Sequence, residues 1–123
     1  MTPRKVLVLE DEKGVAELYA AALRSGGLEP TICNSFPDAR ACLKAELPDG
    51  LLTDVRVGEF NGLQLVHLFR SLSPNGIVVV ATGHDDPTIK AEAEKLGAYF
   101  VTKPVDINAI VNYFRTPTGQ SHR

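Results

Sequence analysis

The chain has 123 residues, 44% of them hydrophobic, which suffices for one compact domain and leaves no room for a second. Its formal net charge of -2 argues against a direct nucleic-acid ligand, because phosphate-backbone binding needs a basic face. The apolar run near the N-terminus, Val6 to Leu9, is too short for a signal peptide or a membrane span. We therefore expect a cytoplasmic protein with no membrane partner.

Short apolar runs alternate along the chain with segments of helical periodicity. Runs without polar interruption are typical of strands buried on both faces of a parallel sheet. Five such strands, each followed by a helix, predict right-handed βαβ crossovers and a sheet covered on both faces. The expected strands are Val6 to Leu9, Thr31 to Cys33, Leu51 to Thr53, Ile77 to Ala81 and Tyr99 to Thr102.

Capping and breaking residues delimit the helices. Ser35 and Asp106 are expected N-caps, Pro87 suits a first helical position, and Gly26-Gly27 should end the first helix. The expected helices run from about Gly14 to Ser25, from Ser35 to before Pro48, from Leu63 to Leu72, from Pro87 to Leu96 and from Asp106 to Phe114. We expect residues 1–115 to form the domain and residues 116–123 a flexible tail.

The helices differ in their apolar faces. The first should bury Val15, Leu18 and Ala22, the third is apolar enough for deep burial, and the last has a clear amphipathic pattern. The cysteines, Cys33 and Cys42, have no zinc-binding spacing and are expected to be small buried hydrophobic residues. A disulfide between them is the less favoured alternative.

Polar side chains stand at the carboxyl ends of four predicted strands. These are Glu10 and Asp11, then Asp54, then Thr82, then Lys103. Parallel strands end at one edge of the sheet, where ligands of such folds bind. A carboxylate nucleophile, acidic metal ligands and a phosphate-binding lysine together suit phosphoryl transfer to aspartate. Alone, each has a plainer interpretation, such as a turn aspartate or a surface lysine.

These segments together resemble the receiver domain of bacterial two-component response regulators. The resemblance extends from Lys5 to about Phe114 and implies a doubly wound (βα)5, flavodoxin-like fold with strand order 2-1-3-4-5. The matching stretches are Val6-Leu7-Val8-Leu9-Glu10-Asp11-Glu12, Leu52-Thr53-Asp54-Val55-Arg56 with Gly62 eight residues after Asp54, Ala81-Thr82-Gly83 and Thr102-Lys103-Pro104.

The resemblance implies a chemistry for this site. Asp54 would accept a phosphoryl group from the phosphohistidine of a sensor histidine kinase or phosphotransfer protein, with Thr82 and Lys103 contacting the phosphoryl oxygens. The domain would promote its own phosphorylation and dephosphorylation without turning over a free substrate as an enzyme does. Mg²⁺ or Mn²⁺ would be held by Glu10, Asp11, Asp54 and the backbone carbonyl of Arg56.

Further roles follow from the same resemblance. Thr82 and Phe100 would form the switch, although Phe100 is equally typical of an ordinary core residue. The Lys103-Pro104 peptide bond would be cis, and Arg56 and His84 would tune the lifetime of the acyl phosphate. We expect a stand-alone receiver that contacts a downstream protein or a second copy through helix 4, strand 5 and helix 5. Exposed candidates there are Lys90, Lys95, Tyr99, Asn108 and Asn112.

Departures from the family pattern leave alternatives open. Val57-Gly58 replaces the common Met-Pro, Glu10 replaces a commoner aspartate, and the spacing before Lys103 is one residue short. A pseudo-receiver that binds partners without being phosphorylated is the main alternative. A hydrolase of the haloacid dehalogenase type is disfavoured, because it needs a general acid two positions after the nucleophile, where Arg56 stands.

Overall fold

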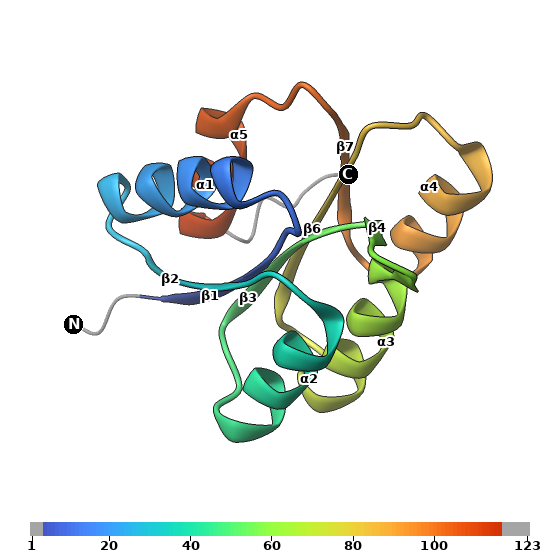
Figure 1. The fold of residues 1–123 in the computed structure, drawn as a ribbon, viewed down its shortest axis with the longest axis horizontal. Coiled ribbons are helices and arrows are strands. Elements are labelled where there is room, and N and C mark those ends of the chain that lie inside the picture. Colours follow the sequence, from blue (N-terminus) through green and yellow to red (C-terminus); the bar gives the residue numbers. More distant parts are fainter. Residues whose placement is uncertain (1–3, 117–123) are drawn as a thin grey trace.

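In the computed structural model, which describes residues 4–116, a parallel sheet is covered by helices on both faces (Figure 1). Its strands are β1 (Lys5–Leu9), β2 (Glu29–Cys33), β3 (Gly50–Asp54), β6 (Ile77–Thr82) and β7 (Tyr99–Thr102). They are ordered β2-β1-β3-β6-β7, which is the 2-1-3-4-5 order when the short strands β4 (Arg56–Val57) and β5 (Phe60–Asn61) are set aside. The predicted fold class is confirmed.

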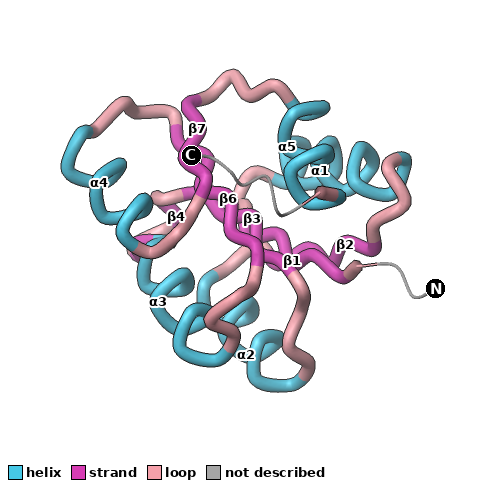
Figure 2. Tube along the Cα trace, turned by 180° about the vertical axis from the view of Figure 1, so that it is seen from behind, coloured by secondary structure: helices cyan, strands magenta, loops and turns pink. Residues whose placement is uncertain are grey.

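The helices form two layers, which Figure 2 shows from the opposite side. One layer, α1 and α5, packs on one hydrophobic cluster, and α2, α3 and α4 cover the opposite face. The helix bounds are α1 (Lys13–Ser25), α2 (Phe36–Ala45), α3 (Gly62–Leu72), α4 (Pro87–Lys95) and α5 (Ile107–Arg115).

The interior strands contribute side chains to both hydrophobic clusters. Because successive side chains of a strand point to opposite faces, Leu51 packs beneath α2 and α3 while Leu52 packs beneath α1 and α5. On β6, Val78, Val79 and Val80 are all buried in the same alternating way. Burial of both faces explains why these strands read as continuous apolar runs.

The predicted helix ends are confirmed. The Ser35 hydroxyl accepts the Asp38 N–H, and the Asp106 carboxylate accepts two N–H groups of α5. Pro87 occupies the first turn of α4. The first helix ends at Ser25 with Gly26 as its C-cap, and Gly27 has a φ of 85°, a conformation that glycine adopts without steric cost.

The predicted apolar stripe of the first helix is wrong at Leu18, whereas Val15 and Ala22 pack against the cluster beneath α1 and α5. Leu18 is 62% exposed, and Val15 and Ala22 are only half-buried. The face against the sheet is displaced by one position, because Tyr19 and Leu23, rather than Leu18, fill the space above the strands. This buried face consists of Ala16, Tyr19, Ala20 and Leu23.

Three smaller differences concern lengths and depth. α3 has a deeply buried apolar face, as predicted, except at its last residue, since Leu72 is 45% exposed. β2 begins at Glu29 and includes Pro30, which an edge strand tolerates. Cys33 is buried as predicted, whereas Cys42 is half-buried, and both are free thiols.

Within residues 4–116, every helix is too short or too polar to cross a membrane. Residues 117–123 of the predicted tail lie outside the described part of the chain.

Candidate functional site

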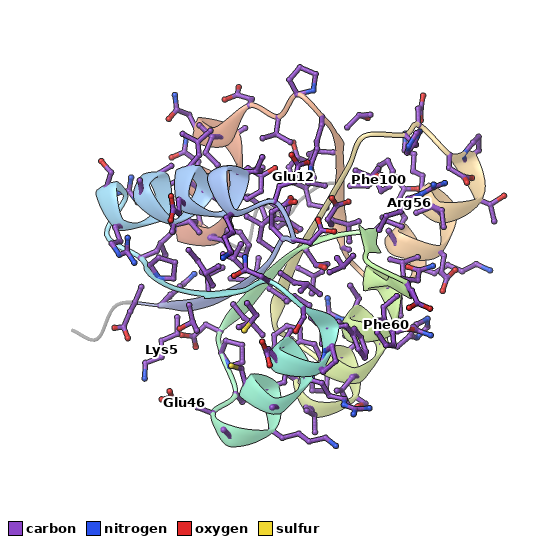
Figure 3. The ribbon with its side chains drawn as sticks, in the orientation of Figure 1. Lys5, Glu12, Glu46, Arg56, Phe60 and Phe100 are labelled. Carbon is purple, nitrogen blue, oxygen red and sulfur yellow. The ribbon has the colours of Figure 1, made fainter. Side chains whose placement is uncertain are left out.

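The register of the sheet brings the polar strand ends together. Leu9 pairs with Thr53, and Thr82 pairs with Thr102, so neighbouring strands end nearly level with one another. Side chains from four distant segments therefore emerge along one edge of the sheet. Figure 3 shows Glu12 where the chain passes from the end of β1 into α1.

Lys103 joins two of the acids. Its Nζ lies 2.9 Å from Glu10 Oε1 and 3.0 Å from Asp54 Oδ2. Burial opposes the charge of Lys103, but the hydrogen bonds to both carboxylates outweigh it and hold its pKa above the ordinary value. Lys103 therefore stays a cation in neutral solution.

Glu10 is the most enclosed of the site's carboxylates, at 1% exposure. Burial raises its pKa, although Lys103 and the Glu12 N–H, 3.1 Å from Oε2, favour the charged form. Its backbone is also held, because the Asn34 amide donates to the Glu10 carbonyl at 2.9 Å. Asn34 was not among the residues predicted from the sequence, although its position directly after a strand was a usable signal.

Three carboxylates form a potential cation site. Glu10, Asp11 and Asp54 each offer an oxygen within 4.8 Å of the others. Asp11 is exposed and Asp54 is half-buried, so solvent reaches both. Oxygen donors of this kind suit hard divalent cations, of which Mg²⁺ is the commonest partner of one or two carboxylates plus a phosphoryl group.

The segment after Asp54 is a short hairpin that the sequence analysis did not predict. Strands β4 and β5 pair antiparallel around Gly58, whose φ is 61°. The Gly58 N–H lies 3.3 Å from Asp11 Oδ2, so the turn contacts a carboxylate of the site. The exposed Phe60 stacks on Phe36 at 4.8 Å between ring centroids and joins the hairpin to α2.

Gly62 makes the tightest backbone approach of the site. A Cβ placed on it would lie 1.8 Å from the Asp54 carbonyl oxygen and 2.7 Å from Thr53 Oγ1. Only glycine fits this contact between the start of α3 and the end of β3. The resemblance included Gly62, but the need for glycine at this position becomes visible only when α3 packs against the end of β3.

The remaining residues from the sequence analysis lie around this pocket. Thr82 is buried, its Oγ1 accepts the N–H of the exposed His84 at 3.3 Å, and its carbonyl accepts the Lys103 N–H at 2.7 Å. Arg56 is exposed, as Figure 3 shows, and its N–H lies 3.3 Å from an oxygen of Asp54. The Lys103-Pro104 peptide bond is cis, the isomer that the resemblance implied.

The two neighbouring aromatic residues of β7 pack against different parts of the molecule. Phe100 is half-buried and packs against the cluster beneath α2, α3 and α4. Tyr99 is 38% exposed and stacks on Tyr113 of α5 at 4.7 Å. Of the two, Phe100 therefore faces the interior on the α4 side, and Tyr99 belongs to the outer surface.

The chain belongs to the response regulator receiver domain family, whose model matches residues 6–115. It is 38% identical over 120 residues to the transcriptional regulatory protein FixJ of Azorhizobium caulinodans, covering 94% of this chain and 56% of that protein. The chain spans about half the length of the curated relatives it matches, such as FixJ.

Solved structures agree in fold. A CheY-like receiver domain protein from Methanospirillum hungatei superposes with a TM-score of 0.88 at 18% identity, over 96% of this chain and 95% of that one. The beryllofluoride-activated NtrC4 receiver domain dimer gives a TM-score of 0.82 at 25% identity, over 90% and 93%. The chain is thus a receiver domain of two-component response regulators.

Proposed function

We propose that Asp54 accepts a phosphoryl group from the phosphohistidine of a sensor histidine kinase or phosphotransfer protein in the cytoplasm. The observation that carries this proposal is the contact of Lys103 Nζ with the Asp54 carboxylate inside a group of three acids. A turn aspartate and a surface lysine have no reason to meet across 49 residues of sequence. Family membership supports the same chemistry.

The residues suit an in-line transfer. An oxygen of the half-buried Asp54 attacks phosphorus while the bond from phosphorus to the histidine nitrogen breaks, which leaves an acyl phosphate on Asp54. Lys103 already contacts Oδ2 and can neutralise a phosphoryl oxygen there. The domain modifies itself by this step and turns over no free substrate.

The donor set fits Mg²⁺ or Mn²⁺. Three carboxylates and one ammonium leave two uncompensated negative charges, which a divalent cation balances. Asp11, Asp54 and the Arg56 carbonyl are the proposed ligands. Glu10, at 1% exposure, is the least accessible of the three carboxylates and would reach the cation through water. When bound, the cation offsets negative charge on the transferring phosphoryl oxygens.

Phosphorylation would act as a population shift. Thr82 would rotate its hydroxyl toward the phosphoryl group, and Phe100 would follow as the space behind Thr82 changes. The outer surface of α4, β7 and α5 would then bind a downstream protein or a second copy of this chain. The structurally similar NtrC4 receiver domain, in its beryllofluoride-activated form, is a dimer. Of the exposed residues expected there, Lys90, Lys95 and Tyr99 belong to α4 and β7, whereas Asn108 and Asn112 line a groove between α5 and the end of α1.

The test uses acetyl phosphate with Mg²⁺ and intact mass spectrometry. We expect the mass of one phosphoryl group to be added to the native chain and to be absent from Asp54→Ala. Asp38→Ala, a carboxylate change on α2, is the matched control and should still be phosphorylated. Chelation of divalent cations should prevent the reaction. A folded wild-type chain that gains no phosphoryl group would instead support the pseudo-receiver.

A second experiment addresses Arg56. We hypothesise that its exposed side chain can lie over the phosphoryl group and hinder attacking water, since its N–H already approaches Asp54. Arg56→Ala should then shorten the lifetime of the phosphorylated protein, measured by loss of the added mass over time. An unchanged or longer lifetime would reject this role, and the same series on His84→Ala tests the other proposed tuning position.

A further inference from the structure

Cys33 and Cys42 form a pair of thiols outside the phosphoryl-acceptor pocket. Cys33 ends β2, Cys42 lies on α2, and their sulfur atoms are 3.4 Å apart. Bonded sulfurs lie about 2.0 Å apart, so a disulfide requires an approach of roughly 1.4 Å. The two thiols are already in contact distance, and no backbone segment has to cross another to join them.

The two thiols differ in accessibility. Cys42 is half-buried and lines a cavity of about 170 Å³ together with Leu7, Ala45 and Pro48. Cys33 is 5% exposed, and burial together with the neighbouring Cys42 raises its pKa to about 12. An incoming reagent therefore meets Cys42 first, and Cys33 stands directly behind it.

We infer that Cys33 and Cys42 are a reversible redox site that reacts with low-molecular-weight disulfides. The Cys42 thiolate attacks one sulfur of the small disulfide and expels the first small thiolate, which takes up a proton. The Cys33 sulfur then attacks Cys42 Sγ, loses its proton and expels the second small thiol. The protein loses two electrons and two protons, and the small disulfide is reduced to two thiols.

The thiol pair lies close to the acidic pocket. The Cys33 carbonyl accepts the Glu10 N–H at 3.1 Å, and the next residue, Asn34, holds the Glu10 carbonyl through its side chain. Oxidation therefore ties α2 to the strand end that supports Glu10. Among the described residues, neither sulfur makes a hydrogen bond to Asp54, Thr82 or Lys103, so the thiol reaction itself does not require a phosphorylated chain.

The experiment treats the native chain with cystamine, blocks the remaining thiols by alkylation and maps peptides by mass spectrometry. We expect an internal link between Cys33 and Cys42, seen as a loss of about 2 Da from the unmodified chain and reversed by dithiothreitol. A native chain that keeps both thiols, stops at a mixed disulfide on Cys42, or only forms linked dimers would overturn the inference.

Two single variants test the assigned order. Cys33→Ala should accumulate a stable mixed disulfide on Cys42, because the resolving sulfur is missing. In Cys42→Ala, the buried Cys33 should react with cystamine at least about tenfold more slowly than Cys42 does in Cys33→Ala. Circular dichroism confirms that each variant is folded, and equal reactivity of the two folded variants would contradict the order. The native-chain experiment decides the main point even if a variant does not fold.

Discussion

The two helices that flank β7 are alike in length and capping but unlike in packing. Both α4 and α5 have nine residues, and each is preceded by an N-cap aspartate, Asp86 or Asp106, whose carboxylate accepts two backbone N–H groups. α4 buries only Ala93, whereas α5 buries Ile110, Val111 and Phe114. Good capping therefore does not decide how firmly a helix is anchored.

The difference matters because each helix is joined to a residue of the proposed site. α4 follows Thr82 through the loop of residues 83–86, and α5 follows Lys103 through residues 104–106. A change at Thr82 thus reaches the weakly packed helix, and a change at Lys103 reaches the strongly packed one. We expect α4 to respond and α5 to serve as the framework.

Removal of the largest α5 side chain should have the largest effect. Phe114→Ala is expected to cost about 3–5 kcal/mol of unfolding free energy, because Phe114 is fully buried and a large cavity would remain. Gly50 faces the ring and has no side chain with which to fill that space. Ile89→Ala, at a half-buried position of α4, should cost only about 1 kcal/mol. Urea unfolding of both variants measures the difference, and equal losses would contradict it.

Amide hydrogen exchange should separate the helices in the unmodified chain. We expect the α4 amides to open at a free energy at least about 1.4 kcal/mol below that of the α5 amides, which is tenfold in exchange protection. Phosphorylation of Asp54 should change α4 exchange more than α5 exchange. Equal protection of both helices would show that the single buried residue Ala93 is sufficient to anchor α4.

Loss of the helix N-caps should show the same difference between α4 and α5, with smaller losses of unfolding free energy. Asp106→Ala is expected to lower the unfolding free energy by about 1 kcal/mol, the usual value for a lost N-cap. Asp86→Ala should have a smaller global effect, because its cost cannot exceed the free energy of opening α4 alone. Urea unfolding compares the two variants, and a larger loss for Asp86→Ala would refute the ranking.

The smallest expected effect concerns Glu10, whose carboxylate contacts Lys103, the site residue that precedes α5. Burial raises the pKa of Glu10 above its ordinary value of 4.5, so the folded chain binds this proton more tightly than the unfolded chain. In metal-free buffer, stability should therefore fall as the pH rises through the folded pKa. Glu10→Gln should lack this slope. Urea unfolding from below pH 4.5 to neutral pH measures this slope, and parallel curves for the native chain and Glu10→Gln would count against the prediction.

Local sequence patterns predicted the elements well. The Ser35 and Asp106 caps and the Pro87 position are set by residues within one helical turn, so short-range rules suffice. The stripe through Leu18 failed because hydrophobicity alone does not say which side of α1 meets the sheet. The hairpin around Gly58 has strands of two residues, too short for any periodic signal.

The sequence by itself determined where the strands end and which polar residues stand there, since both depend on neighbours close along the chain. The tertiary structure alone decided that Glu10 is buried, that Gly62 lies against the Asp54 carbonyl and that Lys103 reaches two carboxylates. Those partners lie 49 and 93 residues from Lys103 in sequence. Burial and distance between such segments depend on how the sheet is assembled, which local periodicity does not specify.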